Sequence, residues 1–216
     1  MIVGISGASG TIYGVQLLRM LRELDVPRYL VMTKSAVLTM SLETDYSVEY
    51  VQSLASETYR VGDLAAPISS GSFKNDGMVI APCSIKTLSA IVNCYEDNLL
   101  LRAAGVTLKE GRPLVLVVRE TPLHLGQLKL MVGAAEIGAR IFPPVPAFYN
   151  KPETIADLVQ QTCSRVLDQF GIDSPTPRWE GAGRDSDAAA ISAVAEPTRP
   201  AEPTRHRSVS AAPRSA

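Results

Sequence analysis

Short apolar runs alternate with amphipathic stretches up to about residue 179 of the chain. Apolar runs bounded by turn residues are typical of strands, and apolar residues three and four positions apart are typical of helices. The sequence therefore predicts strands at residues 2–5, 29–32, 78–80, 114–118 and 141–142. It predicts helices at 12–24, 35–42, 48–56, from 84 onward, and at 97–109, 123–137 and 153–170.

The order of these segments predicts the fold class. The run Leu114-Val115-Leu116-Val117-Val118 is apolar throughout, as expected of a strand that is covered on both faces. Strands that are separated by helices of this length form right-handed βαβ units and hence parallel pairs. We therefore expect an α/β fold: a three-layer, doubly wound, mostly parallel sheet of the Rossmann-like or flavodoxin-like kind.

The composition changes near residue 180. Beyond this point the chain consists mostly of Ala, Pro, Ser, Arg and Glu, with a near-repeat at 195–200 and 201–205. Such a segment has too little apolar surface to offset a backbone entropy of roughly 1–2 kcal/mol per residue. The prediction is one domain at 1–180 followed by a disordered, low-complexity tail at 181–216.

Composition and charge exclude several classes of function. The 216 residues are 46% hydrophobic and 20% charged, which is typical of an ordinary globular domain. The formal net charge of −1 does not favour nucleic acid as a partner, and no run of eighteen apolar residues predicts a membrane span. The three cysteines have no CxxC or Cys/His spacing, so neither a disulfide framework nor a metal site is expected, and a cytoplasmic location is favoured.

Polar and small residues follow the predicted strands, and ligands of such sheets bind at the carboxyl ends of the strands. After the first strand, small residues from Gly4 to Gly10 would let backbone N–H groups approach an anion, although their spacing is not GxGxxG. Thr33, after the second strand, could cap the next helix or contact a ligand, and capping is the more common role. Ser84 would cap a further helix and leave first-turn N–H groups free. Two helix N-termini at one edge favour a phosphorylated ligand.

Charged residues supply the other candidates. Arg119 and Glu120 follow the strand at 114–118, and Tyr149 follows the next strand, so both deliver polar groups to the same edge. Arg102, Lys109 and Arg165 are further cations, each of which taken singly is more typical of a solvated surface residue. Glu43 ends a predicted helix, where the helix dipole disfavours a carboxylate. This local conflict indicates a functional role for Glu43.

Six motifs, taken together and in order, strongly resemble the UbiX/Pad1 flavin prenyltransferases over residues 1 to about 179. They are Gly4-Ile5-Ser6-Gly7-Ala8-Ser9-Gly10, Ser41-Leu42-Glu43-Thr44-Asp45, Ser69-Ser70-Gly71-Ser72-Phe73, Ala81-Pro82-Cys83-Ser84-Ile85-Lys86-Thr87-Leu88, Arg119-Glu120-Thr121-Pro122-Leu123 and Pro143-Pro144-Val145-Pro146-Ala147-Phe148-Tyr149.

The resemblance implies an enzyme that joins the dimethylallyl group of dimethylallyl monophosphate to N5 and C6 of reduced FMN. The product would be prenylated FMN for a UbiD-type decarboxylase, and the enzyme would be a homo-oligomer, expected to be a dodecamer. The residues implied for FMN binding are Gly7, Ala8, Ser9, Thr33, Ser84, Ile85, Lys86, Thr87 and Arg119. Those implied around the prenyl phosphate are Lys109, Arg119, Glu120, Tyr149 and Arg165, with Arg102 from a neighbouring subunit. Ser9, Glu43 and Glu120 are the implied catalytic residues.

These residue types suit the implied chemistry. Fixed guanidinium and ammonium groups stabilise the leaving oxygens of an allylic phosphate, so we expect no metal ion. The chain has no DDxxD-like cluster that would bind magnesium diphosphate, which favours a monophosphate donor. Glu120, Glu43 and the departing phosphate are the candidate proton carriers for ring closure.

Two alternatives remain open at this point. A flavin-dependent cysteine decarboxylase of the same broader superfamily would share the fold, but such enzymes depend on a histidine and an Asn-containing motif. The first histidine here is His124, and the segment 81–87 contains no asparagine. The other alternative is a non-catalytic flavin-binding subunit of a decarboxylase complex, in which the phosphate-site cations would be dispensable.

Overall fold

The computed structural model describes residues 1–176, 178 and 181. Residues Met1–Arg178 form one compact unit. The tail that the composition predicts at 181–216 lies outside the described residues, apart from Gly181.

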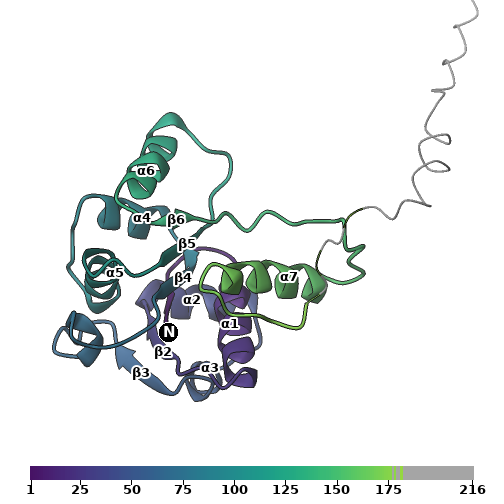
Figure 1. Ribbon diagram of the computed structural model, residues 1–216, viewed down its shortest axis with the longest axis horizontal. Helices are drawn as coiled ribbons and strands as arrows, with labels where there is room; N and C mark the ends of the chain where they lie inside the picture. Colours follow the sequence, from purple (N-terminus) through teal and green to yellow (C-terminus); the bar gives the residue numbers. More distant parts are fainter. Residues whose placement is uncertain (177, 179–180, 182–216) are drawn as a thin grey trace, which may run out of the picture. The chain divides into compact units, whose positions relative to one another are not determined.

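Six strands form one sheet in the order β3-β2-β1-β4-β5-β6, and every neighbouring pair is parallel (Figure 1). The strands are β1 (Ile2–Ile5), β2 (Tyr29–Met32), β3 (Glu57–Arg60), β4 (Met78–Cys83), β5 (Leu114–Val118) and β6 (Arg140–Ile141). This order reverses direction between β1 and β4, which makes the carboxyl ends of these two strands the topological switch point where such folds bind ligands. The α/β, doubly wound prediction is confirmed, with the Rossmann strand order.

One strand is missing from the sequence-based prediction. The sequence of β3, Glu-Thr-Tyr-Arg, has charged residues at both ends, and only Tyr59 of its four residues is buried. Because β3 lies at the edge of the sheet and pairs only with β2, it needs no apolar run, and the hydrophobic pattern cannot identify it.

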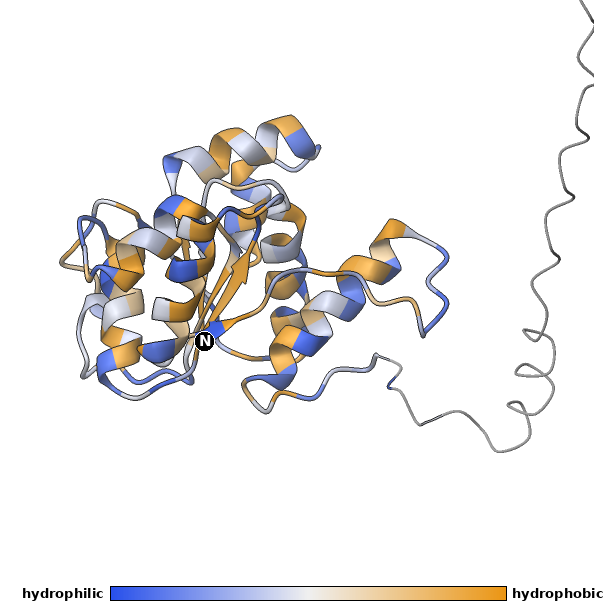
Figure 2. Cartoon of the chain, turned by 90° about the horizontal axis from the view of Figure 1, so that it is seen from above, coloured by the Kyte–Doolittle hydropathy of each residue, from blue (hydrophilic) through white to orange (hydrophobic). Residues whose placement is uncertain are grey.

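Helices cover both faces of the sheet (Figures 1 and 2). They are α1 (Thr11–Glu23), α2 (Lys34–Glu43), α3 (Val48–Ser53), α4 (Ile85–Val92), α5 (Leu99–Lys109), α6 (Leu125–Glu136) and α7 (Ile155–Asp168), with a short 3-10 helix at Pro67–Ser69. All of the predicted helices are present, with ends shifted by up to three residues.

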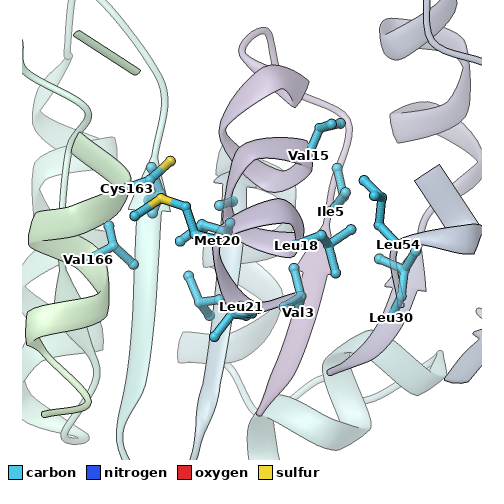
Figure 3. Close-up of a cluster of buried hydrophobic side chains, with 14 of the residues drawn as sticks. Val3, Ile5, Val15, Leu18, Met20, Leu21, Leu30, Leu54, Cys163 and Val166 are labelled. Atoms are coloured by element: carbon cyan, nitrogen blue, oxygen red, sulfur yellow. The ribbon is translucent and has the colours of Figure 1, made fainter. Parts of the chain in front are cut away.

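Two apolar clusters hold the three layers together. Alternate residues of a strand point to opposite faces, so Val3 and Ile5 pack in one cluster and Ile2 in the other. The first cluster contains side chains of α1, α2, α3 and α7, and the second contains side chains of α4, α5 and α6. Figure 3 shows part of the first cluster, with Leu18 and Leu21 of α1 beside Val3. The carboxyl ends of the strands are therefore held on a rigid base.

Gly14 allows α1 to lie close to the sheet. A Cβ atom at this position would be 2.4 Å from the carbonyl oxygen of Ala81 and 2.7 Å from Cδ1 of Ile5. The first distance is to a backbone atom, which cannot move away as a flexible side chain can. A side chain at Gly14 would therefore push α1 away from β4.

We expect Gly14→Ala to lower the free energy of unfolding by about 2 kcal/mol, the usual cost of overpacking a core. Urea unfolding followed by circular dichroism measures the change. Gly62→Ala is the control, because nothing lies within 4 Å of a Cβ at Gly62. Equal stability of the two variants would contradict the close-approach argument.

Candidate functional site

A cavity of about 330 Å³ lies where β1, β2, β4 and β5 end. Its lining includes seven of the residues that the sequence motifs single out: Gly7, Thr33, Ser84, Ile85, Lys86, Thr87 and Glu120. Four segments that are far apart in the sequence thus meet at the switch point of the sheet, as ligand sites of this fold class do.

The N-terminus of α4 supplies backbone donors to this cavity. Ser84 is the N-cap, and its Oγ accepts a hydrogen bond from the N–H of Thr87 at 3.3 Å. The N–H of Ser84 donates to Oγ of Ser6 at 2.9 Å. Within the described residues, the N–H groups of Ile85 and Lys86 therefore remain without a hydrogen-bond partner. The sequence predicts free first-turn N–H groups here. The cap bond to Thr87 and the distant bond to Ser6 leave those of Ile85 and Lys86.

A second helix N-terminus lies at the same cavity. Thr33 caps α2, since its Oγ1 accepts a hydrogen bond from the N–H of Ala36 at 3.0 Å. The loop after β1 packs closely on this turn, because a Cβ at Gly7 would be 2.3 Å from Cβ of Ser35. Glycine is therefore required at position 7 to keep the two loops in contact. The positive ends of α2 and α4 together favour an anion in the cavity.

The N-terminus of α1 has a different partner. Its N-cap is Gly10, which has a φ of 99° and no side chain to cap the helix. Oε2 of Glu43 accepts hydrogen bonds from the N–H of Gly10 at 2.9 Å and from the N–H and Oγ1 of Thr11 at 3.3 Å each. The N–H groups of Gly10 and Thr11 therefore bond to a carboxylate of the protein, and the binding of an anion by the loop after β1 stays a prediction for Gly7, Ala8 and Ser9.

The same bonds explain the unfavourable position of Glu43 at the end of α2. Burial raises the pKa of Glu43, but hydrogen bonds from Ser9, Gly10 and Thr11 outweigh that effect and hold the pKa below its ordinary value of 4.5. Glu43 is thus anionic at neutral pH and lies beside the positive end of α1. The carboxylate is unfavourable at the C-terminus of α2, its own helix, but it is stabilised by hydrogen bonds from the N-terminus of α1.

Eight of the predicted site residues do not line the cavity within this single chain. Three of them, Ala8, Ser9 and Glu43, belong to the loop after β1 or to the end of α2. Arg119 is exposed, and its N–H donates to the carbonyl oxygen of Cys83 at 3.1 Å. Tyr149 lies in a turn after β6 and is 44% exposed. The remaining three are the cations Arg102, Lys109 and Arg165.

Each of these three cations has a carboxylate partner near it in sequence. Arg102 pairs with Glu96 at 2.7 Å, Arg165 pairs with Asp168 at 2.6 Å, and Lys109 pairs with Glu110. Arg102 and Lys109 belong to α5, whereas Arg165 belongs to α7 on the opposite face of the sheet (Figure 1). One chain therefore does not gather them at one point.

Other lining residues escaped the sequence analysis: Ser35, Ala90, Tyr95, Asp97, Asn98 and Leu101. A signal for one of them was present, because Asn98 stands just before an apolar helical stretch and caps α5, with its Oδ1 accepting from the N–H of Leu101 at 3.1 Å. The sequence does not show that α5 starts beside the cavity. That proximity depends on how the helices pack.

All three cysteines are free thiols, and burial raises the pKa of Cys83, which disfavours the nucleophilic thiolate at neutral pH. Cys83 is thus a buried apolar residue, as expected. Over the described part of the chain, no helix has the length and apolar character needed to cross a membrane.

Comparison with known proteins places this site in a class. A family model described as Flavoprotein matches residues 1–166. The chain is therefore a flavoprotein, in agreement with its fold.

Closer relatives identify the family. Flavin prenyltransferase UbiX of Escherichia coli strain K12 is 62% identical over 186 residues, which cover 84% of this chain and 98% of that protein. The crystal structure of AnUbiX (PadA1) in complex with FMN and dimethylallyl pyrophosphate has a TM-score of 0.83 at 48% identity and covers 84% of this chain and 97% of that one. The chain belongs to the UbiX flavin prenyltransferase family. The predicted family, enzyme class and flavin are thereby confirmed.

A more distant likeness bears on the alternative enzyme class. The FMN-dependent cysteine decarboxylase TvaF has a TM-score of 0.56 but only 14% identity, over 79% of this chain and 97% of that one. Similarity at this level shows a shared fold and nothing about activity. The cysteine-decarboxylase alternative therefore gains no support beyond the fold.

Glu43→Gln should make the folded chain less stable at neutral pH. Because folding lowers the pKa of Glu43, the ionised carboxylate stabilises the fold above the ordinary pKa of 4.5, and this contribution disappears as the pH falls through the lower folded value. For an exposed helix cap we expect a loss of about 0.5–1 kcal/mol at pH 7 and a smaller one near pH 3.

Chemical unfolding at the two pH values measures this difference. Glu136→Gln is the matched control, since Glu136 is also exposed and also ends its helix, α6. A loss for Glu43→Gln that is the same at both pH values would contradict the assignment of Glu43 as an ionised cap of α1.

Proposed function

We propose that this chain transfers the dimethylallyl group of dimethylallyl monophosphate to reduced FMN bound at the carboxyl edge of the sheet. The observation that carries the proposal is the meeting of two helix N-termini, those of α2 and α4, at one cavity with unpartnered N–H groups at Ile85 and Lys86. Such groups suit the phosphate of FMN without further cations.

The residues at the cavity fit FMN in chemistry and in size. Neutral hydroxyl and amide groups of Ser35, Thr87 and Asn98 lie beside the free N–H groups, as a sugar-alcohol chain and a phosphate require. A volume of about 330 Å³ lies at the lower end of the roughly 300–1,000 Å³ of small-molecule sites. We infer that a ligand as large as FMN extends past the cavity towards surfaces that a single chain leaves exposed.

We further propose that neighbouring copies of the chain complete the prenyl-phosphate site. Large apolar side chains are exposed on α2, on α6 and on the segment after β6, among them Leu42 at 79%, Leu125 at 67% and Phe148 at 66%. Apolar surface of this kind favours association. A relative with a TM-score of 0.81 and 51% identity, covering 83% of this chain and 98% of that one, is described as a dodecameric FMN-dependent UbiX-like decarboxylase from Escherichia coli O157:H7. Assembly would bring Arg102 and Arg165 of different copies to one site.

The proposed roles follow from the chemistry of the side chains. FMN supplies the nucleophilic ring that accepts the prenyl group. Arg119, Arg165, Lys109 and the neighbour's Arg102 stabilise the phosphate as the allylic C–O bond breaks, and Tyr149 donates to it. Glu120 lines the cavity and moves a proton during ring closure. Ser9, held near Glu43, orients the acceptor.

The product, prenylated FMN, would pass to a UbiD-type decarboxylase. The three free thiols suit a reducing compartment such as the cytoplasm.

Incubating the purified protein with reduced FMN and a prenyl donor tests the function directly. We expect the mass of the flavin to rise by one dimethylallyl group with dimethylallyl monophosphate. Less product should form with the diphosphate, because the sequence has no DDxxD-like cluster to hold magnesium diphosphate. Isopentenyl monophosphate is the control, since it is not allylic and cannot ionise in the same way. An unchanged flavin mass with both dimethylallyl donors would refute the proposal.

Glu120→Gln tests the proton-transfer role. Glutamine keeps the size and one acceptor of the side chain but cannot carry the proton, so FMN should still bind while prenylation slows by about a hundredfold. Single-turnover flavin spectra measure the rate. Glu23→Gln, an exposed acid at the end of α1, is the control and should react at the wild-type rate. A Glu120→Gln variant as fast as wild type would assign proton transfer to another group.

A further inference from the structure

Ser6 joins the end of β1 to the start of α4. The residue follows β1 directly and is 0% exposed. Its hydroxyl donates to the carbonyl oxygen of Pro82 at 2.9 Å and accepts from the N–H of Ser84 at 2.9 Å. The N–H of Ser6 also donates to the carbonyl oxygen of Pro82, at 3.2 Å. One buried side chain thus bonds to residues on both sides of Cys83.

The backbone contributes one hydrogen bond to this connection, from the N–H of Ser6 to Pro82, but the regular ladder does not continue. The regular pairing of β1 with β4 ends at Gly4 and Ile80, and the register between β4 and β5 shifts between Ile80 and Cys83. Pro82 has no N–H to continue the ladder. A serine hydroxyl can donate and accept at the same time, so Ser6 replaces the missing connection with two hydrogen bonds from one atom.

The connection determines where α4 begins. Ser84 is the N-cap of α4, and the next two residues, Ile85 and Lys86, carry the free N–H groups at the cavity. Because the Ser84 N–H is bonded to Ser6, these donors are held at a set distance from the loop after β1. Without the hydroxyl, the Ser84 N–H would be left unsatisfied, and the first turn of α4 would have to shift to find another partner.

We infer that Ser6 is a positioning residue for flavin binding, which acts through Ser84 to hold the N–H groups of Ile85 and Lys86 ready for the anionic group of FMN. This inference rests on the proposed flavin site. Ser6 itself is too deeply buried to touch the ligand.

Ser6→Ala is the first test, with the affinity for FMN measured by fluorescence titration. We expect affinity to fall about tenfold, the scale set by a buried donor that loses its partner. The effect should appear in the KM for FMN, while the KM for the prenyl donor and kcat at saturating FMN stay near wild type. Ser6→Cys keeps the shape of the side chain and weakens its hydrogen bonds, so it should lie between wild type and Ser6→Ala; it carries the same test if Ser6→Ala does not fold.

Thr107→Val is the matched control. Thr107 is 1% exposed, and its hydroxyl donates to the carbonyl oxygen of Ala103 within α5, away from the cavity. Thr107→Val should lower the unfolding temperature of the flavin-free protein, as Ser6→Ala should, but leave the affinity for FMN unchanged. An FMN affinity of Ser6→Ala equal to wild type, or an equal loss in Thr107→Val, would overturn the inference. Wild-type protein that binds FMN but forms no prenylated flavin would instead contradict the proposed function.

Discussion

The burial of both faces of one parallel sheet is the constraint on which the rest of this structure depends. Parallel strands cannot be joined by tight turns, so each connection must cross a face of the sheet, and the crossing helices supply the cover. Every strand then ends at the same edge, and helices start there as well. The N-termini of α1, α2 and α4 follow β1, β2 and β4 directly, which concentrates positive helix ends where the cavity lies.

The N-termini of these helices are capped in two different ways. Glu43 occupies the donors of α1, whereas the first turns of α2 and α4 are capped by neutral hydroxyls that leave other N–H groups free. The carboxylate of Glu43 also keeps Ser9 and the loop after β1 in place. The position of this loop thus depends on one ionised side chain at one helix end.

The sequence by itself determined those features whose physical cause is local. The apolar run 114–118 is short and rich in β-branched residues, which favours a strand buried on both faces, and its predicted bounds are those of β5. Ser84 was predicted as a cap, and capping was one of the two roles given for Thr33, because a cap bonds to a backbone N–H only three residues later. The convergence of Gly7, Ser84 and Glu120 also followed from sequence, since parallel strands must end at one edge.

Only the tertiary structure decided the partners that lie far apart along the chain. Glu43 bonds to Gly10, 33 residues away, and Ser6 bonds to Ser84, 78 residues away. No local pattern encodes such pairs, because a carboxylate or a hydroxyl looks the same in sequence whether it faces water or a distant N–H. The hydrophobic pattern does not predict the edge strand β3, because its pairing with β2, rather than its own apolar content, makes it a strand. The separation of the cations of α5 and α7 is also decided by tertiary structure, because these two helices pack on opposite faces of the sheet in one chain.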